Sequence, residues 1–429
     1  MPAQILPNIA QIEKHLMGYK KLLRSQHYQH FKNITLGIIS GENSIAGISR
    51  YSGVPERTLQ YFFNESVFNE DELLKHSLKA MDQYTTVRST NEAVLILDFT
   101  PSPKTGKKFE WADWLWNEKS DKADIYGYEC LAALEYHPKK QYRKVLGMRR
   151  FYHQDILKED LCCLPEDFEK KPIITSRLAS KVRPLTKAKE VIVDAEFINA
   201  FLINHFKRLK LNWTGRIKKS ILATHRGKTK QLGLLVKDLI KKKDKDIVWQ
   251  KASYRNQKIK AFAITVKIPK FNNGKIIIAV CKNKAKKLAF IATNILDRKA
   301  EDIVRVYGYR WEVEVFFKEL KGNTPFSKYR VRRVGANYRW QIFSLIVANI
   351  LELLRKTKLK RLCFSKRFNW FKKAIKRLYD TTEITIGITL KIIQDLRNGG
   401  RQFILSLKKE KALNISKYYL YRRINFAGV

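Results

Sequence analysis

The chain has 429 residues, 45% of them hydrophobic, and its 85 lysines and arginines against 40 aspartates and glutamates give a net charge of +45. This length and composition predict two to four structural units with a hydrophobic core. Such a charge attracts polyanions, so double-stranded DNA or another nucleic acid is the expected partner. Ribosomal proteins and proteins that bind anionic membranes share the charge, but rarely this size and aromatic content.

Other classes of protein are disfavoured by what the sequence lacks. Its five cysteines show no CxxC spacing, so neither a disulfide framework nor a structural zinc site is supported. No apolar run reaches about 18 residues without a charge, so no membrane span is expected. Residues 1–16 lack the basic and apolar regions of a signal peptide. We therefore expect a cytoplasmic protein.

Residues 1–85 have the apolar spacing of helices, and residues 44–66 fit a helix-turn-helix. Gly53 would be the turn glycine, and Pro55 can open the second helix. The alternative is a plain helical hairpin. If the motif binds DNA, the second helix offers these side chains to a groove: Arg57, Gln60 and Tyr61.

Two apolar runs each end in an aspartate. Val94–Leu97 is apolar with β-branched members, as in a buried strand, and is followed by Asp98. Strand-like runs follow at 125–136 and 140–152, and then Val191–Val193 leads into Asp194 and a helical pattern. A carboxylate at such a position can be a metal ligand or a cap of the strand end, and each aspartate alone favours the cap.

The periodicity changes after this helix. Residues 218–287 contain alternating or β-branched runs separated by charged clusters, which predicts a mostly β unit. Residues 288–295 form another apolar run, and residues 351–429 are basic with a helical pattern and interspersed aromatic residues. That last region suits either a nucleic-acid surface or a dimer contact.

The segment 307–321, YGYRWEVEVFFKELK, is predicted to be one helix. At 3.6 residues per turn, Tyr307, Arg310, Glu314 and Lys321 fall within an arc of roughly 60°. Standing alone, this pattern favours an ordinary amphipathic helix with an i,i+4 ion pair.

The spacing Tyr307-x2-Arg310-x3-Glu314-x6-Lys321 resembles the Y-R-E-K signature of bacterial insertion-sequence transposases of the DDE class. The resemblance covers roughly residues 90–350 and implies an α/β fold, with a ribonuclease H-like mixed sheet flanked by helices. The implied parts are a helical N-terminal DNA-binding unit, a catalytic core in two pieces, a β-rich insertion and a basic helical C-terminal region. Their boundaries would be 1–85, 86–217, 218–287, 288–350 and 351–429.

The resemblance also implies a chemistry. Asp98, Asp194 and Glu314 would bind two Mg²⁺ (or Mn²⁺) ions, hard cations that prefer oxygen ligands. Tyr307, Arg310 and Lys321 would contact DNA at the cleaved end. The expected reaction is nicking at the ends of a mobile element and attack of the freed 3′-hydroxyl on target DNA, by a homodimer on DNA in the bacterial cytoplasm, associated with the nucleoid.

Alternatives stay open at this stage. The same fold could serve a metal-dependent nuclease or junction resolvase that cuts without joining, or a domesticated transposase that only binds DNA. Three other glutamates, Glu196, Glu312 and Glu319, compete for the third carboxylate. The helical projection disfavours Glu312 and Glu319, because each lies away from Arg310 and Lys321.

Overall fold

The computed structural model describes residues 12, 15–40, 42–106, 108–117, 120–153, 168–254, 257–272, 274–282, 288–327, 329 and 331–357. All of them belong to the first of two compact units, Met1–Lys373. The predicted helical region 351–429 lies outside the described residues from position 358 onward. No helix within the described ranges is long and apolar enough to cross a membrane.

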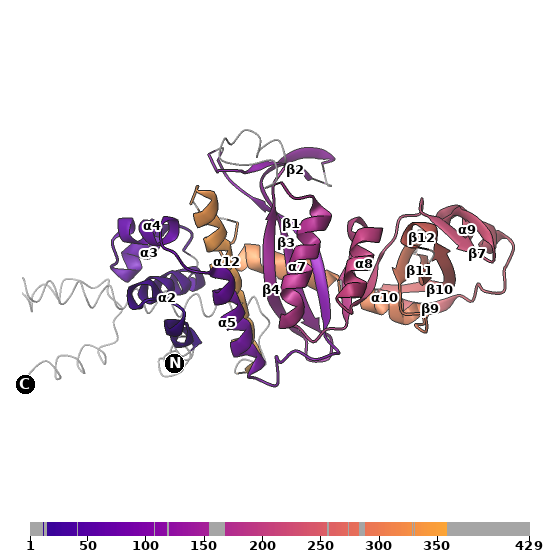
Figure 1. Ribbon diagram of the computed structural model, residues 1–429, viewed down its shortest axis with the longest axis horizontal. Helices are drawn as coiled ribbons and strands as arrows, with labels where there is room; N and C mark the ends of the chain where they lie inside the picture. Colours follow the sequence, from indigo (N-terminus) through magenta and orange to yellow (C-terminus); the bar gives the residue numbers. More distant parts are fainter. Residues whose placement is uncertain are drawn as a thin grey trace, which may run out of the picture. The chain divides into compact units, whose positions relative to one another are not determined.

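Five strands form the centre of the fold in the order β4-β3-β1-β5-β6. Figure 1 labels β1, β3 and β4 in this central region. β1, β3 and β4 are antiparallel neighbours, whereas β5 runs parallel to both β1 and β6. Their bounds are Val94–Pro103 for β1, Lys122–His137 for β3, Tyr142–Phe151 for β4, Glu190–Val193 for β5 and Asn212–Arg216 for β6. The predicted fold class is confirmed, since a mixed sheet flanked by helices in this order is consistent with a ribonuclease H-like fold.

The strands form because their apolar runs are buried on both faces of the sheet. Leu95 and Leu97 on β1 are fully buried and belong to the same core as Leu178 and Phe206. These last two residues lie on the helices that precede and follow β5, α7 (Lys171–Val182) and α8 (Ala200–Arg208). Residues at even positions of β1 point to the opposite face, where α11 (Trp311–Asn323) and α12 (Val334–Thr357) lie.

The end of β1 differs from the prediction. The strand does not stop at Asp98 but continues to Pro103, because its pairing with β3 persists as far as Gly127. A short strand, β2 (Asp113–Asn117), then pairs with the first part of β3. Asp98 therefore lies within a strand and is not a cap of its end.

The region expected to be β-rich extends the same sheet. Strand β12 pairs with β6 on one side and with β11 on the other, so that the sheet has 12 strands in all. One helix, α9 (Leu232–Lys241), interrupts the strands of this region. The strands within 218–287 are β7 (Leu222–His225), β8 (Lys228–Gln231), β9 (Gln250–Tyr254), β10 (Gln257–Ile268) and β11 (Gly274–Lys282). β12 (Leu288–Thr293) is the apolar run that was predicted to follow this region. The boundaries of 218–287 as a separate domain stay a prediction.

The N-terminal part is helical, as the apolar spacing predicted. Its helices are α2 (Ser25–Ser40), α3 (Ile45–Ser52), α4 (Glu56–Asn64) and α5 (Glu70–Asp82). Gly53 ends α3 with φ = 67°, a left-handed conformation that favours glycine. Pro55 stands at the N-cap of α4. Of the four apolar positions that a helix-turn-helix would bury here, Ile48, Leu59 and Phe62 are buried, whereas Val54 is only partly buried. Two helices joined by a short turn are therefore present, and their assignment as a helix-turn-helix stays a prediction.

This helical part is joined to the core by both aromatic packing and ion pairs. Phe63 of α4 stacks on Trp340 of α12, with ring centroids 5.4 Å apart. Arg339 of α12 forms an ion pair of 2.6 Å with Glu70 and donates a hydrogen bond to the carbonyl of Phe63. The long helix α12 thus packs against both the N-terminal helices and the sheet.

Candidate active site

The segment 307–321 is not one helix, contrary to the prediction. It spans the end of α10 (Ala300–Gly308) and most of α11, and the two helices meet at residues 309–310. At this joint the backbone bonds tighten to three-residue spacing: Arg310 N–H donates to the carbonyl of Tyr307 over 3.0 Å. The two helices have different neighbours, because α10 packs on the β9 side of the sheet and α11 contacts β1.

The joint nevertheless brings the predicted residues together. Asp98 on β1 and Asp194 directly after β5 lie side by side, because the strands pair in parallel with Leu97 opposite Val193. Glu314 lies in the first turn of α11. The Arg310 guanidinium lies among the three carboxylates, 2.8 Å from Asp98, 2.7 Å from Glu314 and 4.0 Å from Asp194.

Asp98 is the most buried of the three acids, with 11% of its side chain exposed against 34% for Asp194 and 35% for Glu314. Burial raises the pKa of Asp98 from 3.8 to about 7, because the charged form loses its hydration. The Arg310 guanidinium opposes this shift, and the neighbouring carboxylates Asp194 and Glu314 add to it. The site therefore brings three carboxyl groups together at a place where the charged form of Asp98 is poorly hydrated.

Two further predicted residues lie at the edge of this cluster. The Tyr307 hydroxyl donates a hydrogen bond to Asp194 over 3.3 Å, and its ring stacks against Tyr254 of β9. The Lys321 ammonium donates to the hydroxyl of Thr100 over 2.6 Å. Thr100 is two residues beyond Asp98 and on the same face of β1. Burial lowers the pKa of Lys321 to about 8, so its ammonium loses its charge at a lower pH than an exposed lysine does.

The donor atoms suit a hard divalent cation, but they are not arranged as a closed metal site. Within the described ranges, no group of three or more His, Cys, Asp or Glu side chains is placed to hold a metal ion. The reason lies in Arg310, whose guanidinium takes the central position and neutralises part of the charge of Asp98 and Glu314. Carboxylate oxygens are nevertheless the ligands that Mg²⁺ and Mn²⁺ prefer, so the residue types fit.

The competing glutamates have other partners. Arg143 of β4 binds Glu312 and Glu319, each over 2.8 Å, on the side of α11 away from Arg310. Glu196 lies 3.9 Å from Lys171. The geometry thus places Glu314, and none of these three, against Arg310.

The predicted DNA contacts of the N-terminal part lie on a separate element. Arg57, Gln60 and Tyr61 are exposed on α4, and 62% of the Tyr61 surface is accessible. The buried face of α4 packs on α12, so these three side chains point away from the core. Their role in DNA binding stays a prediction.

Sequence reasoning missed two residues at the site. One is Thr100, whose hydroxyl accepts a hydrogen bond from Lys321. Arg216 follows Gly215, which pairs with Val193, so Arg216 lies beside Asp194 at the end of the neighbouring strand. An exposed cation at the carboxyl end of a short strand was the available indication, but the order of the strands was needed to place it.

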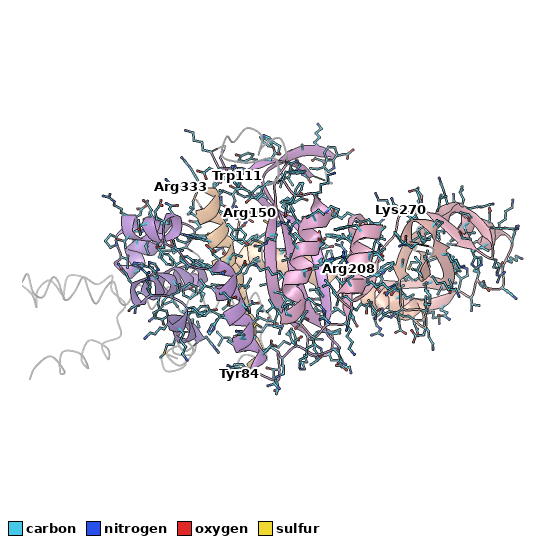
Figure 2. The ribbon with its side chains drawn as sticks, viewed as in Figure 1. Tyr84, Trp111, Arg150, Arg208, Lys270 and Arg333 are labelled. Atoms are coloured by element: carbon cyan, nitrogen blue, oxygen red, sulfur yellow. The ribbon has the colours of Figure 1, made fainter. Side chains whose placement is uncertain are left out.

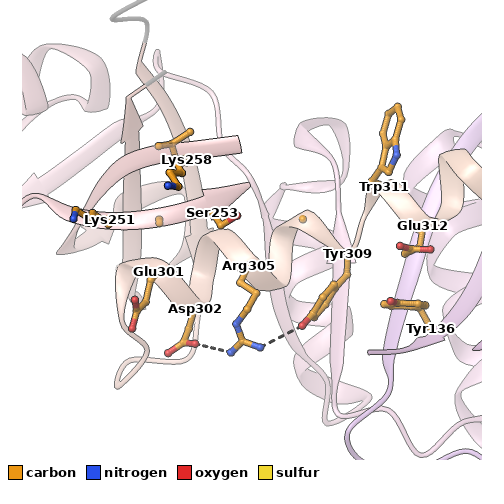
Figure 3. Close-up of a pocket in the computed structure, with 13 residues that line it drawn as sticks. Tyr136, Lys251, Ser253, Lys258, Glu301, Asp302, Arg305, Tyr309, Trp311 and Glu312 are labelled. Carbon is orange, nitrogen blue, oxygen red and sulfur yellow. Dashed lines mark hydrogen bonds and ion pairs between the residues drawn. The ribbon is translucent and has the colours of Figure 1, made fainter. Parts of the chain in front are cut away.

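A cavity of about 940 Å³ opens beside the helix joint (Figure 3). Its lining includes Trp311 and Tyr309 of the joint together with Lys251 and Lys258 of β9 and β10. Arg305 of α10 reaches both Asp302, at 2.6 Å, and the Tyr309 hydroxyl, at 3.2 Å. None of the three clustered carboxylates lines this cavity.

Comparison with known families gives one match. A family model described as "Transposase DDE domain" matches residues 172–350, a range that includes Asp194 and Glu314 but begins after Asp98. The match supports a transposase of the DDE class, a family that acts on DNA and generally uses divalent metal ions. No curated protein matches the chain.

Proposed function

We propose that this protein is a DNA transposase that cleaves at the ends of its own insertion sequence and transfers the 3′-hydroxyl ends to target DNA. The observation that carries the proposal is the convergence of Asp98, Asp194 and Glu314 on Arg310, from three elements far apart in the sequence. The match to a transposase domain over β5 and α11 supports it.

In this proposal the three carboxylates hold two Mg²⁺ or Mn²⁺ ions, as catalytic and metal-binding residues at once. When bound, the ions would help to ionise the attacking water or 3′-hydroxyl and stabilise the leaving oxygen. Asp98 fixes the deepest position, because it is held within a paired strand. Asp194 and Glu314 are more exposed and can adjust to the DNA.

The cationic residues would bind the DNA strand. Arg310 can turn from the carboxylates to a phosphate, where its planar fork contacts two oxygens. Lys321 would contact a neighbouring phosphate as a point charge, and contact with an anion would return its pKa toward the usual range. Tyr307 would donate its hydroxyl to a phosphate oxygen, in place of Asp194.

The remaining parts fit the same proposal. The exposed face of α4, with Arg57, Gln60 and Tyr61, would read the element end in a DNA groove. Two protomers would bridge two ends, so the active form would be a homodimer on DNA, in the cytoplasm of a bacterium and associated with its nucleoid.

The test uses purified full-length protein and labelled DNA that carries the ends of the element, with Mg²⁺, with Mn²⁺ or with EDTA. We expect strand nicking at the end and joining to a target duplex, both lost in EDTA and in Asp194→Asn. Nicking without joining would support the nuclease alternative. DNA binding without either reaction, in wild type and variant alike, would support a domesticated DNA-binding protein.

A further inference from the structure

Two tryptophans are exposed on the short strand β2. Half of the Trp114 surface and 61% of the Trp116 surface are accessible, although both lie in a regular strand. Leu115 between them is buried, so the tryptophans share the outer face of the strand. Large exposed aromatic rings that lie together mark interaction surfaces, and Trp is enriched among the residues that dominate binding energy.

The register of the strands relates the face of β2 that bears the tryptophans to the face of β1 that bears Asp98. Trp114 pairs with Tyr126 of β3, and the carbonyl of Tyr126 accepts a hydrogen bond from the N–H of Lys104. Lys104 is six residues beyond Asp98, so their side chains point to the same face of the sheet. At about 3.3 Å per residue, the hairpin formed by β2 and β3 lies roughly 20 Å from Asp98 along that face.

A basic segment is attached to the base of this hairpin. The N–H of Glu110 donates to the carbonyl of Arg332 over 3.2 Å, and the carboxylate of Glu110 accepts from the N–H of Val334 over 2.8 Å. The attached segment is 331–333, which ends in the adjacent arginines Arg332 and Arg333. Arg333 also forms an ion pair of 2.8 Å with Glu65, at the end of α4. Figure 2 labels Trp111, the neighbour of Glu110, and Arg333.

The charges of the two parts are opposite. The described residues of the hairpin, 113–117 and 120–126, carry three acidic side chains and one basic one in a chain whose net charge is +45. DNA phosphates would be repelled by these acids. A second copy of the chain would be attracted, because its segment 331–333 is basic. The hairpin and this segment lie next to each other, so the combined surface is complementary to itself.

We propose that the β2–β3 hairpin docks on a second copy of this chain through a two-fold contact. In such a contact the same patch is used by both copies. Trp114 and Trp116 of each protomer supply the apolar centre, and the hairpin acids of each face Arg332 and Arg333 of the other. This inference deepens the proposed function by giving the homodimer an interface on the face that bears Asp98, but it does not depend on DNA cleavage.

The test measures the monomer–dimer equilibrium of the full-length protein by sedimentation velocity, alone and with a DNA duplex. We expect the double substitution Trp114→Ala/Trp116→Ala to raise the dimer dissociation constant at least tenfold. Arg332→Glu should raise it as well, and added salt should weaken the wild-type dimer. The matched control is Leu222→Ala/Val248→Ala, because these apolar side chains are 53% and 61% exposed elsewhere on the surface; it should leave the constant unchanged.

Three outcomes would overturn the proposal. In the first outcome, wild type would remain a monomer both alone and with the DNA duplex. In the second, the tryptophan variant would dimerise as tightly as wild type. In the third outcome, the variant would keep its dimer but lose DNA affinity, which would assign the tryptophans to DNA. A protein that dimerises through the hairpin but fails to cut DNA would contradict the proposed function alone, so the two failures can be distinguished.

Discussion

The guanidinium of Arg310 lies 2.8 Å from the carboxylate of Asp98, at the place where the three clustered acids meet. The same group also binds Glu314. Arg310 therefore holds the acids together when no divalent cation does, and it competes with a cation for the same oxygens. Under the proposed function, this relationship would couple metal binding to DNA binding, because a phosphate that attracts Arg310 would free the carboxylates.

The first prediction follows from this competition. In the absence of DNA, Arg310→Ala should bind Mn²⁺ more tightly than wild type, because its carboxylates lack a cationic partner. Calorimetric titration of Mn²⁺ measures the affinity directly. Arg305→Ala, which removes an exposed arginine paired with Asp302 on the preceding helix, is the matched control and should leave it unchanged. Weaker Mn²⁺ binding by Arg310→Ala would contradict the competition.

The raised pKa of Asp98 predicts a pH dependence of stability. The folded protein holds this proton up to about pH 7, whereas the unfolded chain releases it near pH 3.8. Stability from this group is thus present at low pH and is lost as pH rises between about 4 and 7, by at most about 1.4 kcal/mol per pH unit. Because an asparagine side chain does not ionise, Asp98→Asn should not show this loss of stability.

Urea unfolding in EDTA at pH 5 and at pH 8 measures the effect. The free energy of unfolding of Asp98→Asn minus that of wild type should be larger at pH 8 than at pH 5. Comparison of the two proteins at each pH cancels the other titrating groups. An equal difference at both pH values would show that Asp98 is ionised throughout this range.

A second pH effect is expected at Lys321. Because burial lowers its pKa to about 8, its positive charge fades as pH rises from 7 to 9. DNA affinity should therefore fall over this range in wild type and fall less in Lys321→Gln. Fluorescence anisotropy with a labelled duplex at fixed salt provides the measurement. Lys258→Gln, an exposed lysine on β10, should keep the wild-type dependence.

The exposed side chains of α4 give a prediction for DNA recognition. Arg57→Ala should lower affinity and reduce the slope of log affinity against log salt by about one, if Arg57 contacts a phosphate. Gln60→Ala should instead reduce the preference for the element end over unrelated DNA. Neither change should alter the thermal midpoint, because both side chains are exposed. Lys75→Ala on α5 serves as the control, and equal effects of all three substitutions would argue against a recognition helix.

Much of the core could be predicted from local patterns. Val94–Leu97 and Val191–Val193 are apolar runs with β-branched members, and both are buried strands in the structure. The pairing of these strands, which sets Asp98 beside Asp194, is not contained in either run. The resemblance implied only that the two aspartates bind the same metal ions, and the parallel pairing of β1 with β5 is what sets them side by side.

The errors have physical causes that local patterns do not show. Asp98 was expected at a strand end, but pairing with β3 carries the strand on to Pro103. The segment 307–321 was expected to be one helix, because nothing in its apolar spacing marks the joint at residues 309–310. The joint arises from tertiary packing: Tyr307 stacks on Tyr254 of β9, whereas Lys321 binds Thr100 of β1. The four residues of the predicted stripe nevertheless lie at one site: Tyr307, Arg310, Glu314 and Lys321.

The most direct test of the account compares two glutamates that are two residues apart on α11. Glu314 faces Arg310, whereas Glu312 binds Arg143 on the other side of the helix. We predict that Glu314→Gln binds the element ends as tightly as wild type but neither nicks nor joins them in Mg²⁺, and that Glu312→Gln retains both reactions. Full activity of Glu314→Gln would contradict the assignment of the active site.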